Sequence, residues 1–218
     1  MMRTARNSLT LLPALMLAWP PSEAAAREES TEFWLFGTVR GNLSDEIFLG
    51  VDTAYRWRDE GSDSEQQTLR VTLEHAIFDG SRLGGGIALF TADGISEVRP
   101  HQQFRFTSGG LDLRTRFEQR FFDGADQVEL RLRQRVQYTL PLGSGIEGVA
   151  SGEYLTLLQT RDFVGRRGTQ QVRALAGINI PIGSGFYANP AYMLLYSPRP
   201  EGEDRLAHIP QVTINYTF

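Results

Sequence analysis

The sequence contains no cysteine and no lysine, and it has only three histidines. Without cysteine the chain can form neither a disulfide framework nor a thiolate metal or redox site, and it cannot carry a lipid anchor on cysteine. Every one of the 22 basic residues is arginine, and 26 acidic residues outnumber them to give a net charge of −4. This charge balance does not favour nucleic acid as a partner.

Long apolar runs are also rare, and the one that stands out lies near the start of the chain. Residues 8–19 form a short apolar run that follows a basic start and is followed by three alanines at 24–26. This anatomy predicts a secretory signal peptide over residues 1–26 and a mature domain over residues 27–218. A buried N-terminal helix is a weaker interpretation, because Pro13 interrupts the run. No later run is long enough for a membrane helix.

From Glu32 onward apolar residues recur with a period of two, which indicates strands rather than helices. We count eleven strand-like segments, most of them about the ten residues that a tilted strand needs to cross a bilayer. They lie near residues 32–43, 47–57, 68–78, 83–92, 101–107, 111–122, 127–142, 146–159, 170–182, 186–196 and 206–218.

The connections between these segments alternate in length, as they do when successive hairpins open towards opposite sides of a membrane. Short turns rich in Gly, Ser and Asp lie at 44–46, 79–82, 108–110, 143–145 and 183–185. Connections that are usually longer and more charged lie at 58–67, 93–100, 123–126, 160–169 and 197–205. The pattern predicts an all-β fold, a closed antiparallel up-and-down transmembrane β-barrel. Since single-chain bacterial barrels have an even number of strands, we expect ten, with the 32–43 segment outside the wall, or twelve.

Charged residues of neighbouring segments fall on a single face of the sheet. Pairing the strands across residues 123–126 fixes this face, and a slip of two residues would not change it. The predicted pairs are Arg120 with Glu129, Glu118 with Arg131, Arg116 with Arg133, Arg114 with Arg135, and across the next turn Arg135 with Glu153. Apolar residues such as Leu130 and Leu132 occupy the other face.

Two orientations of these faces are open. A soluble periplasmic lipid-binding barrel would expose Arg131 and Arg133, and charge runs are usually solvated. A membrane barrel would instead enclose them, and this is favoured because Leu and Val are too small to fill a barrel of ten to twelve strands. Interlocked Arg and carboxylate groups can fill it. Aromatic residues also gather near segment ends, as in interfacial girdles. They are Phe33, Trp34 and Phe36, Tyr55 and Trp57, Phe186 and Tyr187, Tyr192 and Tyr196, and Tyr216 and Phe218.

Enclosed arginines must be paired or solvated, so two outcomes follow for the lumen. If acids such as Glu74, Asp112 and Glu153 complete the network, the barrel is plugged and its role is structural. Otherwise water fills the lumen and the arginines favour a small anionic solute in a narrow, porin-like passage. We favour the plugged barrel slightly, because side chains can nearly fill an interior of this size.

The last segment carries a recognisable pattern, with Val212, Ile214, Tyr216 and Phe218 at alternating positions. It resembles the closing strand of bacterial outer-membrane β-barrels, the segment that their assembly machinery recognises. EFW at 32–34, RPHQQFRF from Arg99, LRTRFEQRF from Leu113, VELRLRQRVQYTLPL from Val128, GEYL from Gly152 and His208 resemble a family of uncharacterised outer-membrane barrels. The resemblance implies the outer membrane of a Gram-negative bacterium, with its lipid and lipopolysaccharide and the barrel assembly machinery as partners. It implies no reaction.

Catalytic motifs are absent from the sequence. There is no G-x-S-x-G, no H-E-x-x-H and no phosphate-binding loop. We expect Gly84–Gly86 to mark a bend or close packing of a strand. An acid–base site at the outer rim would have to use His101 and His208 with Asp93 and Glu97. Histidines in such positions are more often polar interface residues. We therefore expect no catalytic residue, metal or cofactor, and we expect the acidic segments 59–65 and 200–204 to be solvated. A barrel-embedded hydrolase or lipid-modifying enzyme is the alternative.

Overall fold

The computed structural model describes residues 27–58, 65–92, 95–199 and 202–218. The predicted signal peptide lies outside the described residues, as do most of the acidic segment 59–65 and part of the segment 200–204. Among the described residues there is no helix that could span a membrane. The strands are β1 (Arg27–Thr31), β2 (Phe33–Asn42), β3 (Ile47–Trp57), β4 (Gln66–Phe78), β5 (Ser81–Ala92), β6 (Ile95–Ser108), β7 (Leu111–Phe122), β8 (Glu129–Gly143), β9 (Ile146–Gln159), β10 (Gly168–Gly183), β11 (Phe186–Ser197) and β12 (Asp204–Thr217).

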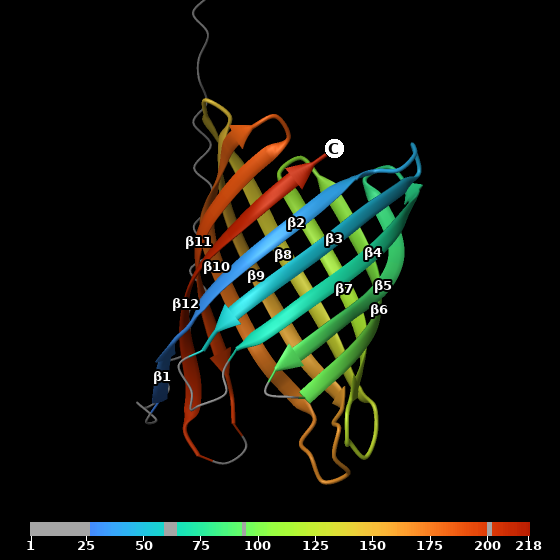
Figure 1. The fold of residues 1–218 in the computed structure, drawn as a ribbon, viewed down its shortest axis with the longest axis vertical. Helices are drawn as coiled ribbons and strands as arrows, with labels where there is room; N and C mark the ends of the chain where they lie inside the picture. Colours follow the sequence, from blue (N-terminus) through green and yellow to red (C-terminus); the bar gives the residue numbers. More distant parts are fainter. Residues whose placement is uncertain (1–26, 59–64, 93–94, 200–201) are drawn as a thin grey trace, which may run out of the picture.

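The strands form one sheet that closes into a barrel (Figure 1). From β2 to β12 each strand pairs antiparallel with the next, as expected for an up-and-down barrel. The closure between β12 and β2 is parallel, however, and runs from Gln211 opposite Trp34 to Thr217 opposite Arg40. The short strand β1 continues along β12 in parallel, from Arg27 opposite Asp204 to Thr31 opposite His208.

The parallel seam explains the strand count. The sheet has twelve strands, one of the two predicted numbers, but eleven of them, β2 to β12, close the wall. These eleven correspond to the eleven segments in the sequence. The 32–43 segment therefore lies in the wall as β2, and the even-number rule does not hold for the wall. An odd number closes because β2 runs in the same direction as β12. In Figure 1 the end of β12 lies at the top and β1 lies at the lower left, so β1 and the end of β12 lie at opposite rims.

Strand β6 is longer than the sequence pattern predicted. Residues 93–100 were expected to form a connection, whereas β6 already begins at Ile95. Pro100 lies within this strand, opposite Ile87 of β5. It faces a break in the pairing with β7, where the register passes from Val98 to His101. A proline fits there because it has no N–H group to donate to a neighbouring strand.

Glycines bring β5 unusually close to its neighbours. A Cβ atom on Gly84 would lie 2.1 Å from the carbonyl oxygen of Leu73, and one on Gly86 would lie 1.9 Å from that of Val71. Neither position therefore accepts a side chain while β4 stays in place. This agrees with the prediction of close packing at Gly84–Gly86.

The two faces of the wall differ sharply in polarity. Along β8, Arg131 and Arg133 are buried inside the barrel, whereas Val136, Tyr138 and Leu140 are exposed on its outer face. Exposed aromatic residues cluster towards each rim. The ring centroids of Phe33 and Trp57 are 5.5 Å apart. At the opposite rim those of Phe186 and Tyr216 are 4.6 Å apart. The outer surface is thus mainly apolar between two aromatic zones.

Trp34 and Phe36 do not belong to these zones, contrary to the sequence-based expectation. Trp34 is buried with Met193, Leu195 and Ile209, and Phe36 packs against this group. The reason is strand alternation, because residues 34 and 36 face the lumen when Phe33 faces outwards. The lumen therefore has an apolar side near the seam.

Candidate functional site in the barrel lumen

The charged residues predicted to share one face meet in the lumen, in the predicted register. The directly opposed pairs are Arg120 and Glu129, Glu118 and Arg131, Arg116 and Arg133, and Arg114 and Arg135 on β7 and β8, and Arg135 and Glu153 on β8 and β9. The connection at 123–128 and the tight turn at 144–145 hold these strands in register, so period-two alternation brings all nine side chains to the same side. The structure thus gathers every residue of the predicted network.

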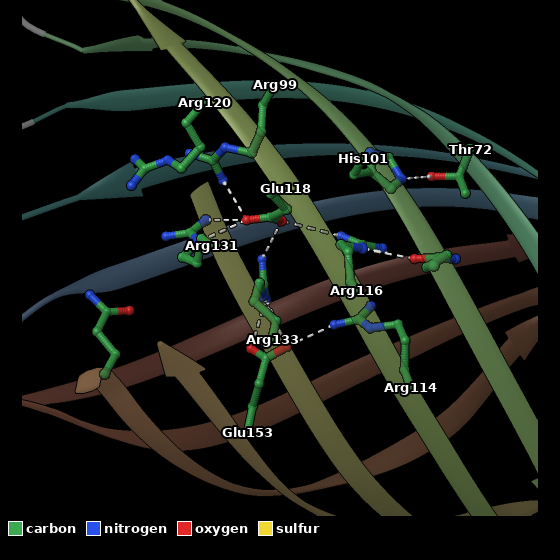
Figure 2. Close-up of polar contacts among 12 residues, drawn as sticks. Thr72, Arg99, His101, Arg114, Arg116, Glu118, Arg120, Arg131, Arg133 and Glu153 are labelled. Atoms are coloured by element: carbon green, nitrogen blue, oxygen red, sulfur yellow. Dashed lines mark hydrogen bonds and ion pairs between the residues drawn. The ribbon is translucent and has the colours of Figure 1, made fainter. Parts of the chain in front are cut away.

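Glu118 is the centre of this network. Its side chain is fully buried, and its Oε2 accepts hydrogen bonds from Nε and Nη2 of Arg131 at 2.8 and 2.5 Å. Nη1 of Arg133 donates to the other carboxylate oxygen at 3.1 Å. Arg99 and Arg116 approach to 3.9 Å (Figure 2). Four guanidinium groups therefore surround one carboxylate, which is the compensation that a buried charge requires.

Glu153 forms a second centre on β9, two strands further on. Arg133 donates to both of its carboxylate oxygens, at 2.8 and 2.7 Å, and Arg114 donates at 2.8 Å. Arg173 of β10 reaches it from the other side at 3.5 Å. Arg133 contacts both Glu118 and Glu153, so it joins the two centres (Figure 2). The network therefore spans strands β7 to β10.

Glu97 completes the network on the side of the longer connections. It accepts two hydrogen bonds from Arg99, at 2.6 and 2.7 Å, and two from Arg120, at 2.7 and 3.0 Å. Arg120 also contacts Glu129 on β8. These contacts tie β6 to β7 and β8.

Acids also complete the network on the side of the short turns. Asp112 contacts Arg135 at 2.5 Å and Arg105 at 2.9 Å. Glu74 accepts a hydrogen bond from Gln103 at 2.6 Å and lies 3.8 Å from Arg105. Glu74, Asp112 and Glu153, which the sequence suggested as partners of the arginines, all contact an arginine in the structure.

Space remains in the lumen beside the network. One cavity has a volume of about 700 Å³, and a smaller one has about 210 Å³. Among the described residues, twelve arginines but only two glutamates line the larger cavity. Most of the balancing carboxylates lie behind the arginines, so the surface of this cavity is strongly positive.

Comparison with known proteins places the chain in a family. Residues 31–206 match the model of the family described as "Protein of unknown function (DUF2490)". The chain belongs to this family. An uncharacterized protein of Methylorubrum extorquens is 27% identical over 192 residues, which cover 82% of this chain and 84% of the relative. The prediction of an uncharacterised family is therefore confirmed. Neither description states an activity.

Several lumen residues within the matched range 31–206 were not predicted from the sequence. Arg99 and Glu97 were missed because Pro100 made their segment look like a connection. Arg173 stands between Val172 and Ala174 on β10, so the same alternation could have identified it. The apolar side of the lumen gave no comparable signal, because both faces of β2 carry large apolar residues.

The histidines of this DUF2490 chain do not form the rim site considered from the sequence. His101 is buried within the barrel, where its Nε2 lies 3.2 Å from the hydroxyl oxygen of Thr72. His208 lies on the outer face of β12 beside Tyr192. The described residues contain no group of three or more His, Asp or Glu able to hold a metal ion. Asp93 lies outside the described residues, and Glu97 is on β6.

Proposed function

We propose that this protein is a non-enzymatic β-barrel of the bacterial outer membrane, with a lumen closed by its Arg–Glu network. The observation that carries the proposal is the inverted polarity of the wall. Glu118 is 0% and Arg133 8% exposed, whereas Val136 is 54% and Leu140 51% exposed on the outside. An apolar exterior and a polar interior suit a barrel surrounded by lipid. A soluble lipid-binding barrel needs the reverse arrangement.

The dimensions of the wall support the same environment. Strands β2 to β12 have 10 to 16 residues, and about 9 to 11 residues suffice to cross a bilayer. The aromatic zones at the two rims suit the interfaces on either side of the hydrocarbon. In this proposal the longer connections face the cell exterior and lipopolysaccharide, and the short turns face the periplasm.

Strand β12 supplies the apolar outer face that the assembly machinery would recognise. Gln211, Thr213 and Asn215 line the larger cavity. Val212, Ile214 and Tyr216 alternate with them and therefore face the lipid. This matches the pattern read in barrel assembly. Binding by the barrel assembly machinery is accordingly part of the proposal.

The contacts of Glu118 and Glu153 support a closed lumen over an open pore. Each carboxylate holds arginines from several strands, and Arg133 joins the two groups. A narrow anion passage is the second candidate, and the excess of arginine around the larger cavity favours it. An embedded hydrolase has less support, because the ring of His101 contacts Thr72 but no carboxylate of the described residues hydrogen-bonds to it to complete a catalytic triad.

Cell fractionation followed by bilayer recording tests these functions. We expect the protein in the outer-membrane fraction, soluble only in detergent, and recovery from the periplasm without detergent would contradict the proposal. In planar bilayers we expect almost no current from the purified barrel. A steady anion-selective current, reversed in selectivity by Arg133→Glu, would support the passage instead.

A further inference from the structure

Two arginines in the larger cavity lack the ion pairs that their neighbours make. Within the described chain, Arg56 and Arg70 have no carboxylate within 4.0 Å, although both line this cavity. Nη1 of Arg56 donates to Gln66 at 2.6 Å. The Nε atoms of both arginines are buried without a hydrogen-bond partner. Guanidinium groups in such a setting favour an anion, because unpaired buried charge is costly.

A third arginine approaches the same place from the far wall. The Cζ atom of Arg56, on β3, lies 4.2 Å from the ring centroid of Trp34. The Cζ atom of Arg173, on β10, lies 5.7 Å from the same centroid. The two guanidinium groups are therefore no farther apart than the sum of these distances. Trp34 itself is held in place because its Nε1 donates to Glu32 at 2.6 Å.

The size and charge of this place define its ligand. A cavity of about 700 Å³ lies within the range of small-molecule sites. Arg173 already shares its charge with Glu153. Arg70 lies opposite Asp52, but that carboxylate pairs at closer range with Arg40, and Arg56 has no carboxylate within ion-pair distance among the described residues. The resulting excess of positive charge matches a dianion better than a monoanion. Guanidinium forks also match the oxygens of phosphate in geometry.

We propose that the lumen binds the phosphate group of a soluble molecule between Arg56, Arg70 and Arg173, beside Trp34. The ligand is soluble and not a lipid, because the site lies inside the wall and not on its lipid-facing surface. The inference rests on the enclosed lumen of the proposed function. It can nevertheless fail separately, because binding to the purified barrel depends neither on its location in the cell nor on conduction.

The test uses Trp34 as a reporter. The full chain carrying Trp19→Phe and Trp57→Phe keeps Trp34 as its one tryptophan. It is titrated with inorganic phosphate in detergent free of phosphate groups, and with acetate at the same ionic strength. We expect a saturable fluorescence change with phosphate, and binding at least tenfold weaker with acetate. Calorimetry should give the same affinity for the unsubstituted chain.

The matched variants are Arg56→Gln with Arg70→Gln in the cavity, and Arg161→Gln in an exposed connection. We expect the cavity double variant to bind phosphate at least tenfold more weakly and Arg161→Gln to bind normally. Phosphate should also raise the unfolding midpoint of the parent but not of the double variant. If the double variant does not fold, the affinities of the parent for phosphate and acetate still test whether the barrel binds phosphate selectively.

Three results would overturn the inference. The first is no saturable response of the parent to phosphate. The second is equal affinity of the parent and the cavity double variant. The third is a response only to vesicles containing phosphatidic acid, which would assign the phosphate to a lipid headgroup.

Discussion

Glu118 on β7 lies directly opposite Arg131 on β8, and one of its carboxylate oxygens accepts two hydrogen bonds from that guanidinium group. The pair lies at the centre of the lumen network and determines what a single substitution there should do. Glu118→Gln keeps the shape of the side chain but leaves Arg131, Arg133, Arg99 and Arg116 without their shared anion.

We therefore expect Glu118→Gln to destabilise the barrel by about 3–5 kcal/mol, as when one partner of a buried ion pair is removed. Urea unfolding of the protein in lipid vesicles measures this. Glu46→Gln is the control, because Glu46 pairs with His75 on the exposed surface and should contribute little. Equal effects of the two substitutions would argue against a central role for Glu118.

The outer face of β5 offers a test of the membrane environment. Ile87 is 47% exposed and lies near the middle of its strand, next to the buried Ala88. Ile87→Arg should cost about 2–4 kcal/mol in vesicles, because an arginine near the bilayer midplane is poorly solvated. Leu142→Arg, near a turn at the rim, should cost about 0–1 kcal/mol. Both are measured by equilibrium unfolding, and two small costs would indicate an exterior bathed in water.

The seam between β2 and β12 can be tested by cross-linking. Thr38 lies opposite Asn215, and Thr38 Oγ1 donates to Asn215 Oδ1 at 2.5 Å. Because the chain has no cysteine, Thr38→Cys with Asn215→Cys should give a single disulfide, seen as a shift on a non-reducing gel.

The control for the seam is Thr38→Cys with Gln211→Cys. Gln211 lies opposite Trp34, four residues before Asn215 on β12 and about 13 Å from it along the strand. This pair should not cross-link. A disulfide in the control and none in the first pair would mean that the seam has a different register.

The close packing at Gly86 should make the barrel's stability sensitive to a side chain at this position. Gly86→Ala would place a methyl group 1.9 Å from the carbonyl oxygen of Val71, so β4 and β5 must separate. We expect a loss of about 1–3 kcal/mol, as for other overpacked sites. Gly50→Ala meets its nearest atom at 3.9 Å and should change the unfolding midpoint little. An equal tolerance of both substitutions would contradict the close approach of the strands.

Much of the lumen network follows from the sequence because strand alternation is local information. Once β7 and β8 are joined by a short connection, the face of Arg131 fixes the faces of Glu118 and Arg133. The parallel seam depends instead on a contact between residues 34–40 and 211–217, and no local pattern encodes its direction. Trp34 was misassigned because large apolar residues stand on both faces of β2, so alternation carries no contrast there.

The seam has a final consequence for the topology of the polypeptide. An even number of crossings returns a chain to its starting side, whereas eleven crossings carry it over. Glu29, on β1, and Thr217, at the end of β12, therefore stand at opposite mouths of the barrel. In the proposed outer-membrane setting, an epitope beside Glu29 and one beside Thr217 would belong to different compartments, and no antibody added to intact cells would reach both.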